Sequence, residues 1–336
     1  MRILVVGADR SDPHGVAINL GDAYLTDALL DELRRSGFDA HAADFGPGAS
    51  LRADRIPASG MRRLFAAVAA ADLVILGGGT LVQDDVGKGF RGLPRLVAAV
   101  SASARVAGTP CVAFAVGAEP VARPIARLYL AAGLLGRTAY VRDQRSFAAV
   151  GAFRPRRRLA ADACWLSPDR TASSARSGAL VALAAKTAKV ADEASVRRLG
   201  EQTGGIRFVQ MSQSGRFSDA DALPTVVRGA FQVVTDSLTV PRMWAEFAGV
   251  ESVAASRLHA LYAGALSGCS LAAIGDVGKV RSFAAEFGVP WYPDLHALAH
   301  AEGRRFELAD PAKIAAARGR VRAALAHVLS GVGGRP

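Results

Sequence analysis

Arg257 and His259 are the side chains of this sequence whose types and spacing best suit chemistry on an anion. They follow a short apolar run, 253–255, that predicts a buried strand, and Ser256 is expected to cap the helix that begins there. The start of a helix favours an anion, because its first N–H groups and its dipole face outward. The alternative for an isolated Arg-x-His is a solvated arginine and a hydrogen-bonded structural histidine.

Other candidate residues also follow predicted strands. Asp22 lies at the first strand–helix turn, and Gly77–Gly79 follow the strand expected at 72–76, where they would let a ligand approach the backbone. Arg142 and Lys279 come shortly after later strands. Three cations, one histidine and one carboxylate suit a small, multiply charged anion together with acid–base chemistry.

Each of these residues also has a simpler interpretation. The triple glycine can be a tight turn, and it lacks the Lys-Ser/Thr of a P-loop. Asp22 can stabilise a helix N-terminus, and Arg142 can pair with Asp143.

The elements that must position these residues alternate between apolar strands and helices along most of the chain. This alternation predicts an α/β protein with two Rossmann-like, doubly wound domains. We expect residues 1–166 to form the first domain, 167–178 a polar linker, and 179–305 the second domain. A C-terminal helix and tail, 306–336, follow. Open sheets of this kind bind ligands at the carboxyl ends of their strands, so we expect the two domains to face a cleft there.

Composition restricts the class of protein. The 336 residues exceed what one hydrophobic core usually serves, and 51% of them are hydrophobic. No apolar run is long enough to span a bilayer, and the first residues suggest a strand rather than a signal peptide. Three widely spaced cysteines predict neither a disulfide framework nor a zinc site. We therefore expect a cytoplasmic protein.

The net charge of +11 comes almost entirely from arginine. The densest cluster, Arg154–Arg158, has no interleaved aromatic residues for stacking on bases, so we expect no nucleic-acid partner. We interpret the cluster as a solvated loop, or as a patch that faces an acidic substrate or an anionic membrane. At most, this would be a peripheral membrane contact.

Taken in order, six short motifs resemble the polysaccharide pyruvyl transferases. The resemblance runs from Met1 to about Pro293. The motifs are Asn19–Asp22, Gly77–Asp84, Val141–Ser146, Ala161–Cys164, Ser256–Ala260 and Gly278–Phe283.

The resemblance implies a GT-B-like architecture and transfer of pyruvate from phosphoenolpyruvate to hydroxyls of a saccharide, with formation of a ketal and release of phosphate. It implies that His259 and Asp22 are catalytic, and that no metal or organic cofactor is required. It also implies a role in exopolysaccharide or cell-wall glycan biosynthesis, on an acceptor that can be lipid-linked, nucleotide-linked or free. The implied binding residues are Asn19, Gly21, Gly78, Gly79, Arg142, Arg257, Leu258 and Lys279.

The proposed chemistry needs one acid and one base. A proton must reach the methylene carbon of the donor, and an attacking hydroxyl must lose its proton, so we assign these steps to His259 and Asp22 without ordering them. The first alternative is a GT-B-type glycosyltransferase that uses a sugar nucleotide, and the second is a non-catalytic binder of anions or nucleic acid that uses the arginine excess. The sequence leaves open the acceptor and the oligomeric state, and a homo-oligomer is compatible with it.

Overall fold

The computed structural model describes residues 1–85, 87, 92–170, 175–213, 218–235 and 238–333. The chain divides into two compact units. Unit 1 comprises Met1–Val16, Asp22–Ser167 and Ala316–Pro336, and unit 2 comprises Ala17–Gly21 and Pro168–Ala315.

The division differs from the predicted domain ranges in two segments. Ala17–Gly21 groups with unit 2, although it lies within the predicted first domain, and Ala316–Pro336 groups with unit 1. The main division, after Ser167, lies one residue beyond the predicted end of the first domain. Residues 171–174 of the predicted linker lie outside the described residues.

Unit 1 is built on a parallel sheet in the order β3-β2-β1-β4-β6-β7-β8, with β5 paired to β6. Its central strands are buried on both faces, as their continuous apolar sequences require. The strand order reverses between β1 and β4. The strands are β1 (Arg2–Val6), β2 (Asp39–Asp44), β3 (Arg55–Pro57), β4 (Leu73–Gly77), β5 (Thr80–Val82), β6 (Cys111–Ala118), β7 (Thr138–Val141) and β8 (Arg156–Leu159).

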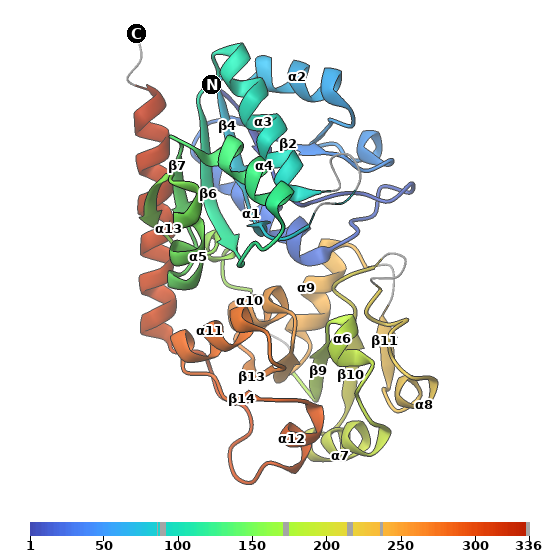
Figure 1. The fold of residues 1–336 in the computed structure, drawn as a ribbon. Coiled ribbons are helices and arrows are strands. Elements are labelled where there is room, and N and C mark those ends of the chain that lie inside the picture. Colours follow the sequence, from blue (N-terminus) through green and yellow to red (C-terminus); the bar gives the residue numbers. More distant parts are fainter. Residues whose placement is uncertain (86, 88–91, 171–174, 214–217, 236–237, 334–336) are drawn as a thin grey trace. The chain divides into compact units, whose positions relative to one another are not determined.

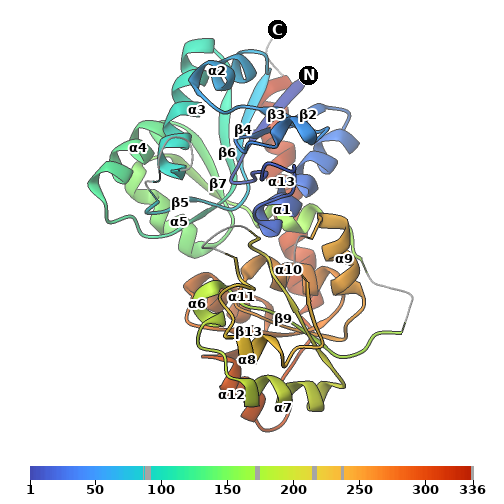
Figure 2. The same ribbon diagram turned by 90° about the vertical axis from the view of Figure 1, so that its right-hand side faces the viewer.

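Helices cover both faces of this sheet. Figure 2 shows α2, α3, α4 and α5 along one face, and α1 and α13 along the other. Right-handed crossovers explain this division. The crossover through α1, from β1 to β2, runs in one direction along the sheet, and the crossovers from β3 onward run in the other, so their helices lie on opposite faces. The helices are α1 (Leu20–Arg35), α2 (Met61–Ala69), α3 (Leu93–Ala107), α4 (Pro124–Leu134), α5 (Gln144–Val150) and α13 (Pro311–Gly333).

Unit 2 repeats this plan with a parallel sheet in the order β11-β10-β9-β12-β13-β14. The order reverses between β9 and β12, so these two strands flank its topological switch point. Figure 1 shows α9, α10 and α11 together, and α12 beside α7. The strands are β9 (Ala179–Ala182), β10 (Ile206–Val209), β11 (Val233–Thr235), β12 (Ser252–Ala255), β13 (Ser270–Ile274) and β14 (Trp291–Tyr292). The helices are α6 (Ala185–Ala188), α7 (Glu193–Thr203), α8 (Thr225–Arg228), α9 (Val240–Ala248), α10 (Leu258–Leu266), α11 (Gly278–Phe287) and α12 (Leu295–His300).

The prediction that Arg154–Arg158 is a loop is wrong. Arg156–Leu159 forms β8, which pairs in parallel with β7 at the edge of the sheet. The side chains of the strand are all exposed, so its polar sequence shows no burial pattern that would reveal a strand. Within the described residues, no helix combines the length and the apolar character needed to cross a bilayer.

A buried cluster of charges connects β1, β3 and α1 in unit 1. The carboxylate of Asp9, after β1, accepts hydrogen bonds from Arg52 and from Nη2 of Arg55, the latter at 2.8 Å. Nη2 of Arg55 also lies 2.5 Å from Asp27 on α1. The side chains of Arg55 and Asp9 are each only 2% exposed, so each charge depends on its partner.

We expect Arg55→Met to destabilise the protein by about 3–5 kcal/mol, because it removes one of the two arginines that pair with the buried Asp9 carboxylate and also the partner of Asp27. Urea unfolding followed by tryptophan fluorescence, to which Trp165 buried in unit 1 contributes, measures this loss. The control is Arg197→Met, whose exposed ion pair with Glu193 should contribute at most about 0.5 kcal/mol. Equal effects of the two substitutions would contradict the expectation.

Candidate functional site

The helix that begins after β12 carries Arg257 and His259, as the sequence predicts. Its N-cap residue is Arg257, so the prediction that Ser256 caps the helix is wrong. The Ser256 hydroxyl instead accepts a hydrogen bond of 2.8 Å from the backbone N–H of Ala184, beyond β9. Ser256 therefore joins the carboxyl ends of β9 and β12, where the strand order of unit 2 reverses. Arg257 and His259 thus stand at the usual ligand position of such a sheet.

Arg257 is held by a buried carboxylate that our sequence analysis missed. Its Nε lies 3.0 Å from Oδ2 of Asp219, and its Nη2 donates to Oδ1. The Asp219 side chain is completely buried, whereas that of Arg257 is 26% exposed. Asp219 also accepts the backbone N–H groups of Met211 and Ser212, at 3.2 and 3.0 Å. The two-point contact fixes the plane of the guanidinium while leaving part of it accessible.

Burial raises the pKa of the Asp219 carboxyl above its ordinary value. The Arg257 guanidinium and the two backbone N–H groups act in the opposite direction, because they favour the carboxylate. Arg257 therefore stabilises the buried Asp219 carboxylate, and Asp219 in turn fixes the position of Arg257.

His259 packs against the backbone of the predicted Asn19–Gly21 motif. The Leu20 N–H donates to the Met211 carbonyl at 2.8 Å, so this motif runs beside the segment that follows β10. A Cβ atom added to Gly21 would lie 2.2 Å from Nδ1 of His259. The Asn19 side chain accepts the Gly21 N–H at 2.9 Å, which fixes the local turn. The half-buried imidazole thus requires glycine at position 21.

Lys279 lies in the first turn of α11, in the segment that follows β13. Its side chain is half-buried. The preceding loop passes close to the end of β12, because a Cβ on Gly275 would lie 3.6 Å from that of Ser256. Arg281, one half-turn later, pairs with Asp276 and lies over the Trp291 ring, 4.1 Å from its centroid.

Arg142 follows β7 in unit 1 and is buried in a polar cluster. Its side chain is 2% exposed and donates to Asp143 at 3.1 Å and to Asp162 at 3.3 Å. A third hydrogen bond, of 3.3 Å, reaches Oγ1 of Thr80. Gly117 leaves room for the guanidinium, since a Cβ there would lie 2.5 Å from Cζ. The alternative pairing with Asp143 is thus present, together with two further contacts.

Gly78 and Gly79 lie against the start of α1. Both have positive φ, of 83° and 73°. A Cβ on Gly78 would lie 2.1 Å from Cδ2 of Leu25, and one on Gly79 would lie 2.8 Å from Oδ1 of Asp22. The glycines are therefore required for the close approach of α1 as well as for the turn. This packing places the carboxylate of Asp22 beside the turn after β4, at the switch point of unit 1.

The structure thus brings the predicted residues together in two groups. In unit 2 it collects Asn19, Gly21, Arg257 and His259, with Leu258 buried in the first turn of α10. In unit 1 it collects Asp22, Gly78 and Gly79 at one strand end and Arg142 at another. The unit 2 group combines a fixed cation, an imidazole and a helix N-terminus, which can bind an anion and move a proton.

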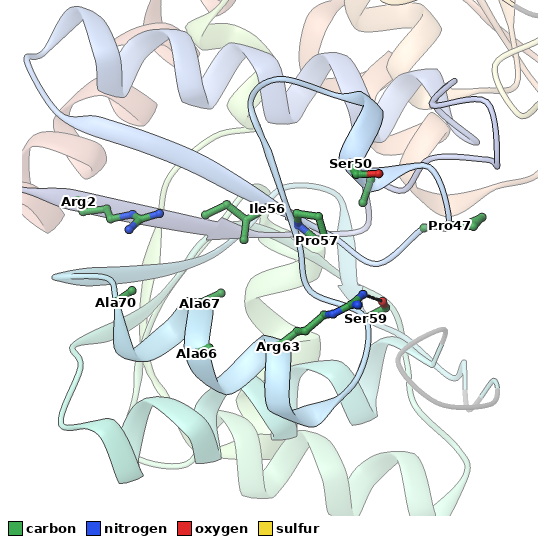
Figure 3. A pocket seen from close by; sticks show the side chains of 12 residues that line it. Arg2, Pro47, Ser50, Ile56, Pro57, Ser59, Arg63, Ala66, Ala67 and Ala70 are labelled. Atoms are coloured by element: carbon green, nitrogen blue, oxygen red, sulfur yellow. Dashed lines mark hydrogen bonds between the residues drawn. The ribbon is translucent and has the colours of Figure 1, made fainter.

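A separate hollow of about 650 Å³ lies beside α2 in unit 1 (Figure 3). Small and apolar residues of α2 and β3 form much of its wall, with Arg2, Arg63 and two serines as its polar groups. Its lining residues, as far as the structure describes them, include none of the predicted site residues. This hollow offers no histidine or carboxylate for acid–base chemistry, so we do not assign the reaction to it.

Comparison with protein families gives one assignment that covers most of the chain. The family model described as polysaccharide pyruvyl transferase matches residues 19–276. This range includes every motif quoted above except the last, Gly278–Phe283, which begins two residues beyond it. No curated protein matches the chain significantly.

Several solved structures have folds similar to that of this chain. S. aureus MnaA in complex with UDP has a TM-score of 0.62 at 9% identity, over 100% of this chain and 98% of that one. UDP-GlcNAc 2-epimerase from Neisseria meningitidis, bound to UDP-GlcNAc, has a TM-score of 0.60 at 9% identity, with 98% and 100% covered. Anabaena HepE, in complex with UDP and glucose, has a TM-score of 0.59 at 14% identity, with 98% and 99% covered.

These identities are low, so the likeness establishes the fold alone. The predicted fold class, two Rossmann-like domains of the GT-B-like type, is confirmed.

We expect Gly21→Ala to displace the His259 imidazole, because the new methyl group would occupy the space of Nδ1. The ring resonances of His259 in NMR spectra should shift, and the melting temperature should fall by several degrees as the clash is relieved. Gly319→Ala in α13 is the control, since a Cβ there meets nothing within 4 Å. Unchanged His259 resonances in Gly21→Ala would show that the packing is not required.

Proposed function

Because the chain belongs to the polysaccharide pyruvyl transferase family, we propose that it transfers pyruvate from phosphoenolpyruvate to two hydroxyls of a saccharide. The observation that carries this proposal is the anchored pair at the start of α10, with Arg257 fixed by buried Asp219 and His259 by Gly21. A rigid cation next to an imidazole suits a donor that must be held by its charges and protonated on carbon.

The donor carries a carboxylate and a phosphate, so its site needs several fixed positive groups. We assign Arg257 and Lys279 to the binding of these groups, together with the N-terminus of α10. Leu258 is the first residue of α10, and its side chain is 5% exposed, so its contribution to binding would be its backbone N–H. Asn19 and Gly21 act by shaping the turn on which His259 packs.

In the reaction we propose, an acid delivers a proton to the methylene carbon of phosphoenolpyruvate, which leaves a cationic carbon at C2. A saccharide hydroxyl attacks C2 and gives its proton to a base, and the C2–O bond to phosphate breaks. A second hydroxyl then attacks C2 to close the ketal, and its proton goes to the departing phosphate. The products are the pyruvyl ketal and inorganic phosphate. His259 and Asp22 are the groups that we assign to the proton transfers, and either order of acid and base balances the reaction.

Arg142 has a different role in this proposal. Its side chain is 2% exposed and is shared among Thr80, Asp143 and Asp162, so we assign it to positioning the Thr80 hydroxyl and to adding positive charge at the site. Gly78 and Gly79 also have a positioning role in this proposal, because they allow α1, and with it Asp22, to pack closely against the turn after β4. Phosphoenolpyruvate is a cytoplasmic metabolite, and we place the reaction there.

Thermal stability in the presence of phosphoenolpyruvate tests the donor. A donor present at about a hundred times its Kd should add about 2.7 kcal/mol and raise the melting temperature by several degrees. Arg257→Gln should abolish this increase, whereas Arg197→Gln, on the exposed face of α7, should keep it. An increase with UDP-GlcNAc and none with phosphoenolpyruvate would instead favour a sugar-nucleotide enzyme.

We expect His259→Asn to lower the rate of phosphate release by about 10²–10⁴-fold, because positioned proton transfer contributes that much. The assay supplies phosphoenolpyruvate and a panel of hexosides with neighbouring free hydroxyls. His300→Asn, at the exposed end of α12, serves as the control and should leave the rate unchanged. Near-normal turnover by a folded His259→Asn protein would remove His259 from the mechanism.

Asp219→Asn should raise the KM for phosphoenolpyruvate by about 10–100-fold with a smaller effect on kcat, since the amide no longer fixes the Arg257 guanidinium. Asp221→Asn provides a matched control, because that carboxylate is 72% exposed and 3.9 Å from Arg228. Asp219→Glu should restore part of the affinity. A change in kcat alone would argue against a positioning role for Asp219.

A further inference from the structure

Helix α4 is apolar on its outward side as well as on its inward side. Ala126, Leu130, Gly133 and Leu134 are buried against unit 1. On the outward side, Ile125, Leu128 and Leu135 are 45%, 64% and 58% exposed. Ile125 and Leu128 are three residues apart and share one stripe of the helix, and Leu135 is the C-cap residue that directly follows it.

Such a stripe is unusual on an exposed helix, which normally presents polar residues to water. The neighbouring helix α3 extends it, because Arg105 donates to the carbonyls of Ala132 and Leu135 at 2.9 and 3.3 Å. Val106, the next residue, is 78% exposed. Several large apolar residues exposed on two packed helices point to an interaction surface.

Arginines surround this apolar stripe. Arg123 and Arg127 are exposed at the start of α4, Arg105 lies at its end, and Arg95 lies over the Tyr129 ring, 5.5 Å from its centroid. Helices α3 and α4 contain no Asp or Glu. The Asp84 carboxylate, near the start of α4, accepts the backbone N–H groups of Ala122 and Arg123 at 3.2–3.3 Å.

We propose that α4 and the C-terminal end of α3 form a docking surface for an anionic phospholipid membrane. In this arrangement Ile125, Leu128 and Leu135 enter the headgroup region, while the arginines contact lipid phosphates. Membrane binding of a helix that lies in the interface grows with its apolar area and with its attraction to anionic lipids, and this surface has both features. Figure 2 shows α4 on the face of the unit 1 sheet opposite α1 and α13.

The arginines around α4 favour an anionic membrane, rather than a second copy of this chain, as the partner of this surface. A twofold contact through α4 would bring the same arginines of both copies together, with no carboxylate from α3 or α4 to neutralise them. An anionic bilayer supplies neutralising phosphates at high density without any specific geometry.

Sedimentation with lipid vesicles tests this proposal. The full-length protein should bind vesicles of phosphatidylcholine with about 30% phosphatidylglycerol, and should bind pure phosphatidylcholine vesicles at least tenfold more weakly. Leu128→Gln with Leu135→Gln should weaken binding about tenfold through lost apolar burial, and Arg123→Gln with Arg127→Gln by a similar factor. Circular dichroism checks that these exposed substitutions leave the fold intact.

Two matched controls separate this surface from general effects of charge and apolarity. Leu308→Gln removes a leucine that is 60% exposed in unit 2, and Arg156→Gln with Arg158→Gln removes two exposed arginines of β8. Both variants should bind as the wild type does. Equal weakening by a control, no binding to anionic vesicles at low salt, or a dimer that Leu128→Gln dissociates would each overturn the proposal.

Discussion

The buried contact between Asp219 and Arg257 is the interaction on which the candidate site of unit 2 depends. One carboxylate accepts hydrogen bonds from Arg257, after β12, and from the backbone of Met211 and Ser212, after β10. The same residues after β10 pair with the Asn19–Leu20 segment. Because Asp219 is completely buried, none of these donors can be lost without leaving part of its charge uncompensated. The position of Arg257 and the course of the N-terminal motif are therefore coupled.

A second constraint is the absence of side chains at particular positions. Gly21 admits the His259 imidazole, Gly79 admits the Asp22 carboxylate, and Gly117 admits the Arg142 guanidinium. In each case a polar side chain occupies the space of a missing Cβ, so close backbone contact helps to immobilise the candidate chemical groups. Rigid placement of this kind is what acid–base chemistry requires, because small displacements of a catalytic group reduce rates strongly.

The sequence predicted most long elements because their apolar periodicity is local. Strands such as β4 and helices such as α3 follow directly from such patterns. Asp219 could not be predicted, because its partner Arg257 lies 38 residues away and no motif connects them. The grouping of Ala17–Gly21 with unit 2 also escaped prediction, since it depends on backbone pairing with Met211–Gln213 that leaves no periodic signal. Long-range contacts of single residues thus limit what sequence alone reveals.

Helix α4 illustrates the same limit for surfaces. A helix that is apolar all round normally predicts complete burial, and its sequence does not say which stripe remains uncovered. The strand order decides this, because α4 connects neighbouring strands β6 and β7 and packs closely with α3. One side of the helix packs into the core of unit 1, and the residues on its outward side stay exposed among arginines. Exposed leucines contribute little to the core of unit 1, and their position among arginines fits the contact with an anionic surface that we propose.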